Sequence, residues 1–173
     1  MLLLFDEVQT GWGRTGSLMA YMGYGVKPDC VSMAKAMGGG MPIGAMCTSA
    51  KLALTFGPGA HGSTYAGNPV CCAASYAQIK EIIDNNLSDN SAKMGEYFSC
   101  LLAKLPHVKE VRGLGLMVGV ETNYECGDLV SKAQEKGLLI NVANGTVIRF
   151  VPPLIITREE LDKVVEIIDE ILP

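Results

Sequence analysis

The sequence predicts an α/β protein in which the later part of a domain with a mainly parallel sheet is followed by a smaller α+β domain. Three observations predict this. Short apolar runs alternate with helical periodicity in the first half, which is typical of a parallel sheet. The second half has shorter strand-like runs between helices. Hydrophobic residues make up 49% of the 173 residues and charged residues only 18%, so much of the chain is expected to be buried.

Strand signals dominate the first 67 residues, where most of the glycines also lie. Strands are expected over residues 2–5, 30–33 and 43–48. The first strand runs into Asp6-Glu7 and then into a glycine-punctuated loop that ends at Gly16. Because a buried parallel strand directly at the start needs neighbours on both sides, the chain is expected to be a fragment of a longer protein.

Helix signals begin at Asn68-Pro69, where an N-cap residue is followed by proline at the first helical position. Helices are expected over residues 70–85, 89–105, 128–136 and 157–172. Ser88 is expected to cap the second of these, and Thr157 with Glu160 forms a capping box for the last. Further strands are expected over residues 112–122, 138–142 and 147–151. The domain boundary is placed near residue 77, which divides the chain into residues 1–77 and 78–173.

Charge and composition exclude several classes of protein. The net charge is −4, so binding to nucleic acid or another polyanion is not expected. No apolar run approaches the roughly 18 residues of a membrane helix, and no signal-peptide pattern is present. Six cysteines without a C-x-x-C pair, and only two histidines, predict reduced thiols, a cytoplasmic location and no metal site.

The apolar strand that ends in Asp6-Glu7 is similar to the Walker B strand of a nucleotide hydrolase. Its phosphate-binding partner, G-x-x-x-x-G-K-[ST], does not occur in the chain. A fragment could lack that loop, so a nucleotide hydrolase fragment stays open as an alternative.

A second feature favours different chemistry. Lys35 directly follows the second strand and is flanked by Ala34, Ala36 and a glycine triplet. Small neighbours leave room for a planar ring, and lysine forms Schiff bases once it is desolvated; a solvated lysine in a flexible turn is the alternative. Because ligands bind at the carboxyl ends of parallel strands, Asp6 and Lys35 are expected to face one pocket. A Schiff-base lysine and an acid for the pyridine nitrogen are what pyridoxal phosphate requires.

Several motifs, in order, resemble the class III (subgroup II) pyridoxal-phosphate-dependent aminotransferases, and most of all their acetylornithine and ornithine branch. The resemblance covers nearly the whole chain. The segments that carry it are Asp6-Glu7-Val8-Gln9-Thr10-Gly11, Gly13-Arg14-Thr15-Gly16, Ala34-Lys35-Ala36-Met37-Gly38-Gly39-Gly40, His61-Gly62-Ser63-Thr64, Arg112-Gly113-Leu114-Gly115-Leu116 and Arg149-Phe150-Val151-Pro152-Pro153-Leu154. The resemblance implies a fold-type I transferase of which this chain is the carboxyl-terminal portion.

The resemblance also implies roles toward the cofactor, pyridoxal 5'-phosphate. Lys35 is expected to bind it covalently and then to act as general base and acid. Asp6 is expected to pair with the pyridine nitrogen, Val8 to pack on a ring face and Gln9 to lie near the ring hydroxyl. Read without the family, Asp6 could be only a strand-end acid and Val8 only a core residue.

Two further sites follow from the same resemblance. Thr64, with Ser63 beside it, is expected to reach the cofactor phosphate of a neighbouring subunit, which implies a homodimer with shared active sites. Arg149 is expected to hold the substrate carboxylate, because a guanidinium presents a donor fork that matches a carboxylate. The alternative for Thr64 is an ordinary loop hydroxyl. The alternative for Arg149 is a salt bridge to a structural carboxylate.

The expected function is amino transfer between an N-acetylornithine-like omega-amine and 2-oxoglutarate or glutamate, in arginine biosynthesis. An ornithine or 4-aminobutyrate type of class III transaminase is the alternative within the family. A non-catalytic assembly module is the alternative of another class, beside the nucleotide hydrolase fragment. In the family a glycine-rich turn upstream of the Asp strand holds most of the cofactor phosphate, so the isolated chain is expected to be inactive.

Overall fold

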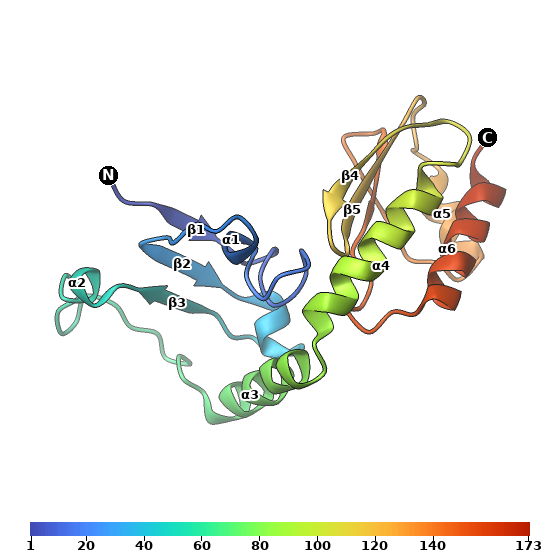
Figure 1. Ribbon diagram of the computed structural model, residues 1–173. Coiled ribbons are helices and arrows are strands. Elements are labelled where there is room, and N and C mark those ends of the chain that lie inside the picture. The colour runs from blue at the N-terminus through green and yellow to red at the C-terminus, as the bar shows by residue number, and fades with distance from the viewer. The chain divides into compact units, whose positions relative to one another are not determined.

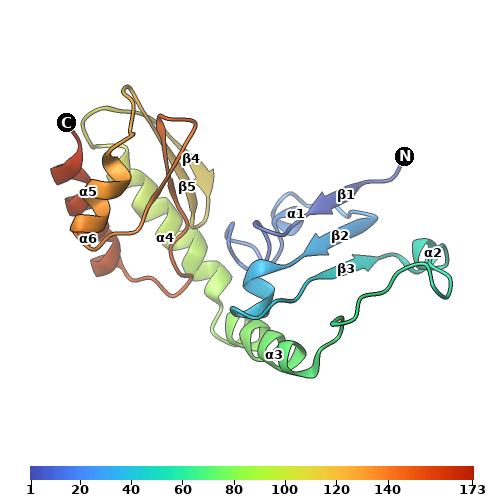
Figure 2. The same ribbon diagram turned by 180° about the vertical axis from the view of Figure 1, so that it is seen from behind.

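The computed structural model describes residues 1–173, which form two compact units, Met1–Ser88 and Asp89–Pro173 (Figures 1 and 2). Helix α3 (Pro69–Asp84) belongs to the first unit. The predicted division into residues 1–77 and 78–173 falls inside this helix and stays a prediction about the whole protein.

The first unit contains a three-stranded sheet in the order β1-β2-β3. Its strands are β1 (Leu4–Asp6), β2 (Cys30–Met33) and β3 (Ala45–Thr48). β1 and β2 are parallel, as the sequence predicts, and the structure pairs Asp6 with Ser32. β3 runs antiparallel to β2, because the short connection between them is too tight for the crossover that a parallel neighbour needs.

The helices of the first unit are mostly short. They are α1 (Ala20–Gly23), the 3-10 helix η1 (Lys35–Gly38), α2 (Ala50–Ala53) and α3 (Pro69–Asp84). The predicted cap of α3 is confirmed, since the Asn68 side chain accepts hydrogen bonds from the backbone N–H groups of Val70 and Cys71. α3 packs against η1 and thereby supports the segment that carries Lys35.

The apolar start of the chain is not buried in this structure. Leu4 is 66% exposed, and Leu2 and Leu3 are exposed as well. The prediction of a buried strand here is wrong for the chain as described, because β1 is an edge strand of its sheet and no helix of the chain covers these side chains.

The second unit packs helices against one face of an antiparallel sheet in the order β4-β5-β7-β6. The strands are β4 (Val108–Leu114), β5 (Met117–Thr122), β6 (Asn141–Ala143) and β7 (Val147–Phe150). The helices are α4 (Leu87–Leu102), α5 (Leu129–Glu135) and α6 (Arg158–Ile171). The predicted capping box of α6 is confirmed, because Thr157 and Glu160 exchange both of its hydrogen bonds.

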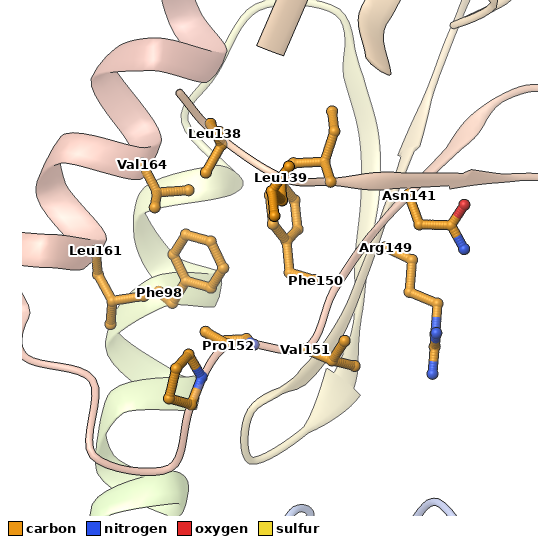
Figure 3. A pocket seen from close by; sticks show the side chains of 12 residues that line it. Phe98, Leu138, Leu139, Asn141, Arg149, Phe150, Val151, Pro152, Leu161 and Val164 are labelled. Carbon is orange, nitrogen blue, oxygen red and sulfur yellow. The ribbon is translucent and has the colours of Figure 1, made fainter. Parts of the chain in front are cut away.

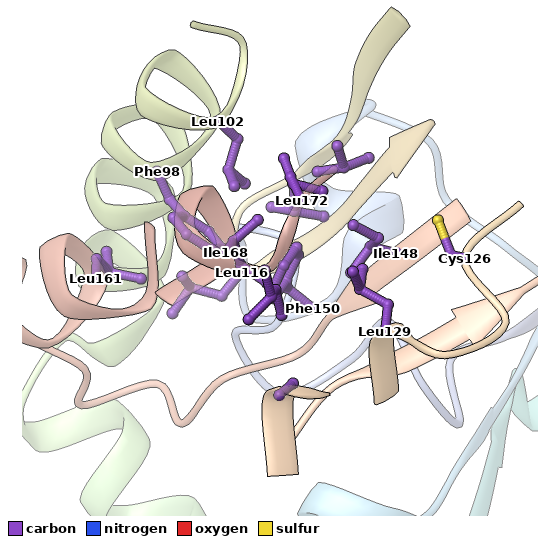
Figure 4. Close-up of a cluster of buried hydrophobic side chains, with 14 of the residues drawn as sticks. Phe98, Leu102, Leu116, Cys126, Leu129, Ile148, Phe150, Leu161, Ile168 and Leu172 are labelled. Carbon is purple, nitrogen blue, oxygen red and sulfur yellow. The ribbon is translucent and has the colours of Figure 1, made fainter. Parts of the chain in front are cut away.

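A single core holds the second unit together (Figure 4). Buried side chains from all three helices meet those of β5 and β7; they include Phe98, Leu102, Val118, Val120, Leu129, Ile148, Phe150, Leu161 and Ile168. The rings of Phe98 and Phe150 meet edge to face at 5.1 Å between centroids. Since alternate residues of a strand face opposite sides, Gly119 and Arg149 lie on the sheet face away from this core.

Most element boundaries shift by one to three residues from the prediction, and two further differences change how an element is formed. The single strand expected over residues 112–122 is a hairpin of β4 and β5, because Gly115, with a φ of 53°, lets the chain turn back after Leu114. The helix expected over residues 89–105 begins at Leu87 and ends at Leu102. Ser88 therefore lies inside α4 and is not its cap, since the left-handed turn at Asn86 (φ 50°) already separates α3 from α4.

Gly95 of α4 allows a close approach between helix and hairpin. A Cβ atom at this position would lie 2.0 Å from the backbone oxygen of Gly115. We expect Gly95→Ala to lower the free energy of unfolding by at least about 2 kcal/mol, because backbone on both sides must move apart. Urea denaturation of a full-length protein that contains the chain measures this. Gly127→Ala is the control, since nothing lies within 4 Å of its added carbon, and equal losses would contradict the explanation.

None of the helices is both long enough and apolar enough to cross a membrane.

Candidate active site

The carboxyl ends of β1 and β2 bring the two central predicted residues to one edge of the sheet. Asp6 is the last residue of β1, and Lys35 follows two positions after the end of β2. Because the two strands are parallel and directly hydrogen-bonded, their ends point the same way. Both side chains are exposed, so this edge can receive a ligand.

Asp6 is held by hydrogen bonds to only one of its carboxylate oxygens. Oδ1 accepts a bond from the backbone N–H of Val8 and another from the Ser32 hydroxyl, each at 3.0 Å. No protein group donates to Oδ2. One oxygen therefore fixes the orientation of the carboxylate, and the other can accept a hydrogen bond from a ligand.

Lys35 begins η1 with a left-handed backbone, at a φ of 48°. A non-glycine residue in this region is uncommon and persists only where its surroundings hold it. Here the parallel strand β2 fixes the segment before Lys35, and η1 is packed on α3 after it. The backbone therefore sets the direction in which the Lys35 side chain points from the start of η1.

Glu7, next to Asp6, has a different role. Its side chain is 1% exposed, and it accepts hydrogen bonds from the Thr10 hydroxyl and from the backbone N–H of Tyr21, the latter at 2.9 Å. Glu7 thus ties the loop after β1 to α1. A carboxylate engaged in this way is not available to a magnesium ion at a Walker B strand, and no group of three or more potential metal ligands occurs in the structure.

The other predicted cofactor residues lie in two places. Val8 and Gln9 follow Asp6-Glu7 in the loop that Glu7 anchors, with Val8 half-buried and Gln9 exposed. Ser63 and Thr64 are exposed and lie in the segment between α2 and α3. No hydrogen bond joins either hydroxyl to Asp6 or Lys35. The predicted reach of Thr64 to a neighbouring subunit stays a prediction.

Arg149 lies on β7 in the second unit, between the buried residues Ile148 and Phe150. Its half-buried side chain therefore leaves the sheet on the face away from the core. Directly opposite on β6 is Asn141, and on the other side, on β5, is Gly119. Figure 3 shows the side chains of Asn141 and Arg149 next to each other at a cavity of about 340 Å³. This cavity is otherwise lined mainly by apolar groups such as Phe98 and Leu161.

Arg112 lies in the same row of the sheet, opposite Gly119 on β4, and it pairs with two carboxylates. It donates hydrogen bonds to Glu121 at 2.7 Å and to Glu110 at 3.0 Å. The bond from Arg112, together with one from Lys109, holds the pKa of Glu121 below its ordinary value. Arg112 is thus a structural arginine.

The prediction from sequence missed Ser32, Glu7 and Asn141. Ser32 is a polar residue within an otherwise apolar strand, and this was the available signal. Glu7 and Asn141 gave no comparable signal, because the burial of one and the cross-strand neighbour of the other depend on distant parts of the chain.

Comparisons with known proteins show the family of the chain. The sequence model of the family described as Aminotransferase class-III matches residues 1–172. The acetylornithine aminotransferase of Methanothermobacter thermautotrophicus is 48% identical over 176 residues, which cover 99% of this chain and 45% of that protein. The chain thus spans about half the length of the curated relatives that it matches.

Two solved structures are similar over 99% of the chain. The acetylornithine aminotransferase of Elizabethkingia anophelis has a TM-score of 0.91 at 36% identity, with 47% of that chain covered. An ornithine aminotransferase of Toxoplasma gondii, described with partial occupancy of PLP at its active site, has a TM-score of 0.92 at 37% identity, with 42% of that chain covered. These similarities confirm the predicted fold class and leave no support for a nucleotide hydrolase.

Proposed function

This chain belongs to the class III aminotransferases, and from that membership we propose that the protein containing it is a pyridoxal-phosphate-dependent transaminase. The observation that carries the proposal is the joint position of Asp6 and Lys35 at the ends of the parallel strands β1 and β2. The carboxylate has one oxygen without a protein donor, and small residues flank the lysine along the chain, which suits a flat cationic ring.

In this proposal each residue has a defined task. When bound, pyridoxal phosphate supplies an electron-withdrawing ring and a carbonyl carbon that binds amines. Oδ2 of Asp6 accepts a hydrogen bond from the ring nitrogen and keeps that nitrogen protonated. Nζ of Lys35 would hold the cofactor and, once released by the substrate amine, would take the proton from the amine-bearing carbon of the substrate and deliver it to the former carbonyl carbon of the cofactor. Val8 packs on the ring, Gln9 lies near its hydroxyl, and Ser63 and Thr64 bind the phosphate of a neighbouring subunit.

Arg149 binds the substrate carboxylate in this proposal. Its guanidinium offers two parallel N–H donors, which match the two oxygens of a carboxylate. Its place on the sheet face opposite the helices of the second unit, next to Asn141 at a cavity, supports this task. Glutamate and 2-oxoglutarate, which both carry such a group, are the proposed amino donor and acceptor pair.

The proposed second substrate is N-acetylornithine or the corresponding aldehyde, which makes arginine biosynthesis the pathway. The 48% identity with acetylornithine aminotransferases supports this choice. Ornithine is the second candidate, supported by the TM-score of 0.92 to an ornithine aminotransferase. We further propose a cytoplasmic homodimer; the six free cysteines agree with a reducing compartment.

The experiment that tests the proposal is covalent mapping of the cofactor. A full-length protein that contains the chain is incubated with pyridoxal phosphate, reduced with borohydride and digested. We expect mass spectrometry to find the reduced cofactor on the peptide that carries Lys35, because only a lysine bonded to the cofactor carbonyl retains it after reduction. Label on other lysines, such as the exposed Lys51, with none on Lys35 would overturn the assignment.

A further inference from the structure

The hydroxyl of Ser32 is the one side-chain group that donates a hydrogen bond to the proposed cofactor acid, Asp6. Ser32 lies on β2 directly opposite Asp6 on β1, and its Oγ donates to Oδ1 of Asp6 at 3.0 Å. The backbone strengthens this link, since the N–H of Glu7 donates to the carbonyl of Ser32 at 2.9 Å. Side chain and main chain of Ser32 thus both hold the end of β1.

The two donors to Oδ1 determine how the carboxylate is presented. A carboxylate on a single rotatable bond can turn about that bond and exchange its oxygens. The Ser32 hydroxyl approaches Oδ1 from the neighbouring strand, whereas the Val8 N–H approaches it from the loop after β1. With both donors on Oδ1, rotation is restrained and Oδ2 stays directed to the ligand side.

Ser32 also connects the acid with the lysine. It precedes Lys35 by three residues, and only Met33 and Ala34 lie between them. One short stretch of backbone therefore carries the amine and, through the Ser32 hydroxyl, orients the acid. A group at this place can set the position of both ends of a bound ring.

We propose that Ser32 is a positioning residue for the cofactor: its hydroxyl holds the Asp6 carboxylate so that Oδ2 meets the pyridine nitrogen. The inference rests on the proposed function, because it assumes that the ligand at this edge is pyridoxal phosphate. Ser32 itself does not touch the cofactor or the substrate and acts only through Asp6.

The test measures cofactor binding and the state of the ring nitrogen in a full-length protein that contains the chain. We expect Ser32→Ala to raise the dissociation constant for pyridoxal phosphate roughly five- to tenfold, the range that one lost hydrogen bond gives. With ¹⁵N-labelled pyridoxal phosphate, the nitrogen signal of this variant should move toward that of the unprotonated ring. Asp6→Asn removes the charge of the acid. It therefore shows the largest change to be expected in the dissociation constant and in the nitrogen signal.

Three further variants separate positioning from a general effect on folding. Ser32→Thr keeps the hydroxyl and should behave like the wild type, and Ser32→Cys, a weak donor of similar size, replaces Ser32→Ala if that variant does not fold. Thr48→Val is the matched control, because it removes a hydroxyl that donates to the Asp29 carbonyl in the same sheet and has no link to Asp6. It should leave both readouts unchanged.

The outcomes distinguish the two proposals. If the wild-type protein binds pyridoxal phosphate and Ser32→Ala has the same affinity and nitrogen signal, the proposed role of Ser32 is overturned. The proposed function is then unaffected. A Ser32→Thr variant that is as weak as Ser32→Ala overturns it too, since the hydroxyl is then not the cause. Wild-type protein that binds no pyridoxal phosphate overturns the proposed function and this inference with it.

Discussion

Replacing Lys35 by alanine is expected to lower transaminase kcat/KM at least about 10³-fold in a full-length protein that contains the chain. The physical reason is that the amine both holds the cofactor and carries the proton between two positions, and general acid–base catalysis alone contributes about 10²- to 10⁴-fold. Steady-state kinetics with glutamate and 2-oxoglutarate measure the loss. Pyridoxal phosphate should also become removable by dialysis.

Two variants show whether the chemistry of the amine is responsible. Lys35→Arg keeps the positive charge, but a guanidinium cannot lose its proton at neutral pH and so cannot act as a base, and it should be as inactive as Lys35→Ala. Lys51→Ala removes an exposed lysine from α2 and should keep full activity. A Lys35→Arg variant with more than about a tenth of the wild-type activity would refute the assignment.

Replacing Arg149 by alanine should raise KM for glutamate about 10²-fold while the cofactor stays bound. Truncating one partner of a hydrogen-bonded charge pair costs about 2–5 kcal/mol. Arg149→Lys should recover only part of this, because a single ammonium group cannot reproduce the two parallel bonds of a guanidinium. Initial rates over a range of glutamate concentrations, with absorbance of the bound cofactor as the second readout, test the prediction.

Arg112→Ala is the matched control for Arg149, since it removes a guanidinium from the same row of the same sheet. Its partners Glu110 and Glu121 are surface carboxylates, and such pairs contribute about 0–1 kcal/mol to stability. We expect little change in KM. Loss of cofactor in Arg149→Ala with a normal KM after the cofactor is resupplied would contradict a role in substrate binding.

Much of the fold could be predicted because its signals are local. The Asn68-Pro69 start of α3 and the Thr157–Glu160 box of α6 each depend on a few consecutive residues, and both are present. The hairpin at Gly115 was missed because the apolar run around it has no polar turn residue. The exposed Leu4 shows the opposite error, since a buried strand was inferred from composition without the elements that would cover it.

The candidate site was predictable in its main residues and not in their supports. Asp6 and Lys35 are recognisable because each follows a short apolar strand, and a parallel pairing then brings them to one edge. The Ser32 hydroxyl, the burial of Glu7 and the placement of Asn141 beside Arg149 need the register of strands that are far apart in sequence. A shift of one residue in the β1–β2 register would turn Ser32 to the other face of its sheet, and the same shift between β6 and β7 would turn Asn141.

The sequence by itself determined the family of this protein, the order of its elements and the residue types that its chemistry needs, since these follow from motifs and short-range periodicity. The tertiary structure alone decided which oxygen of Asp6 is held, which carboxylate is buried and which carboxylates pair with Arg112. The reason is that hydrogen bonding and burial are set by groups brought together from distant positions, so they exist only once strand register and packing are in place.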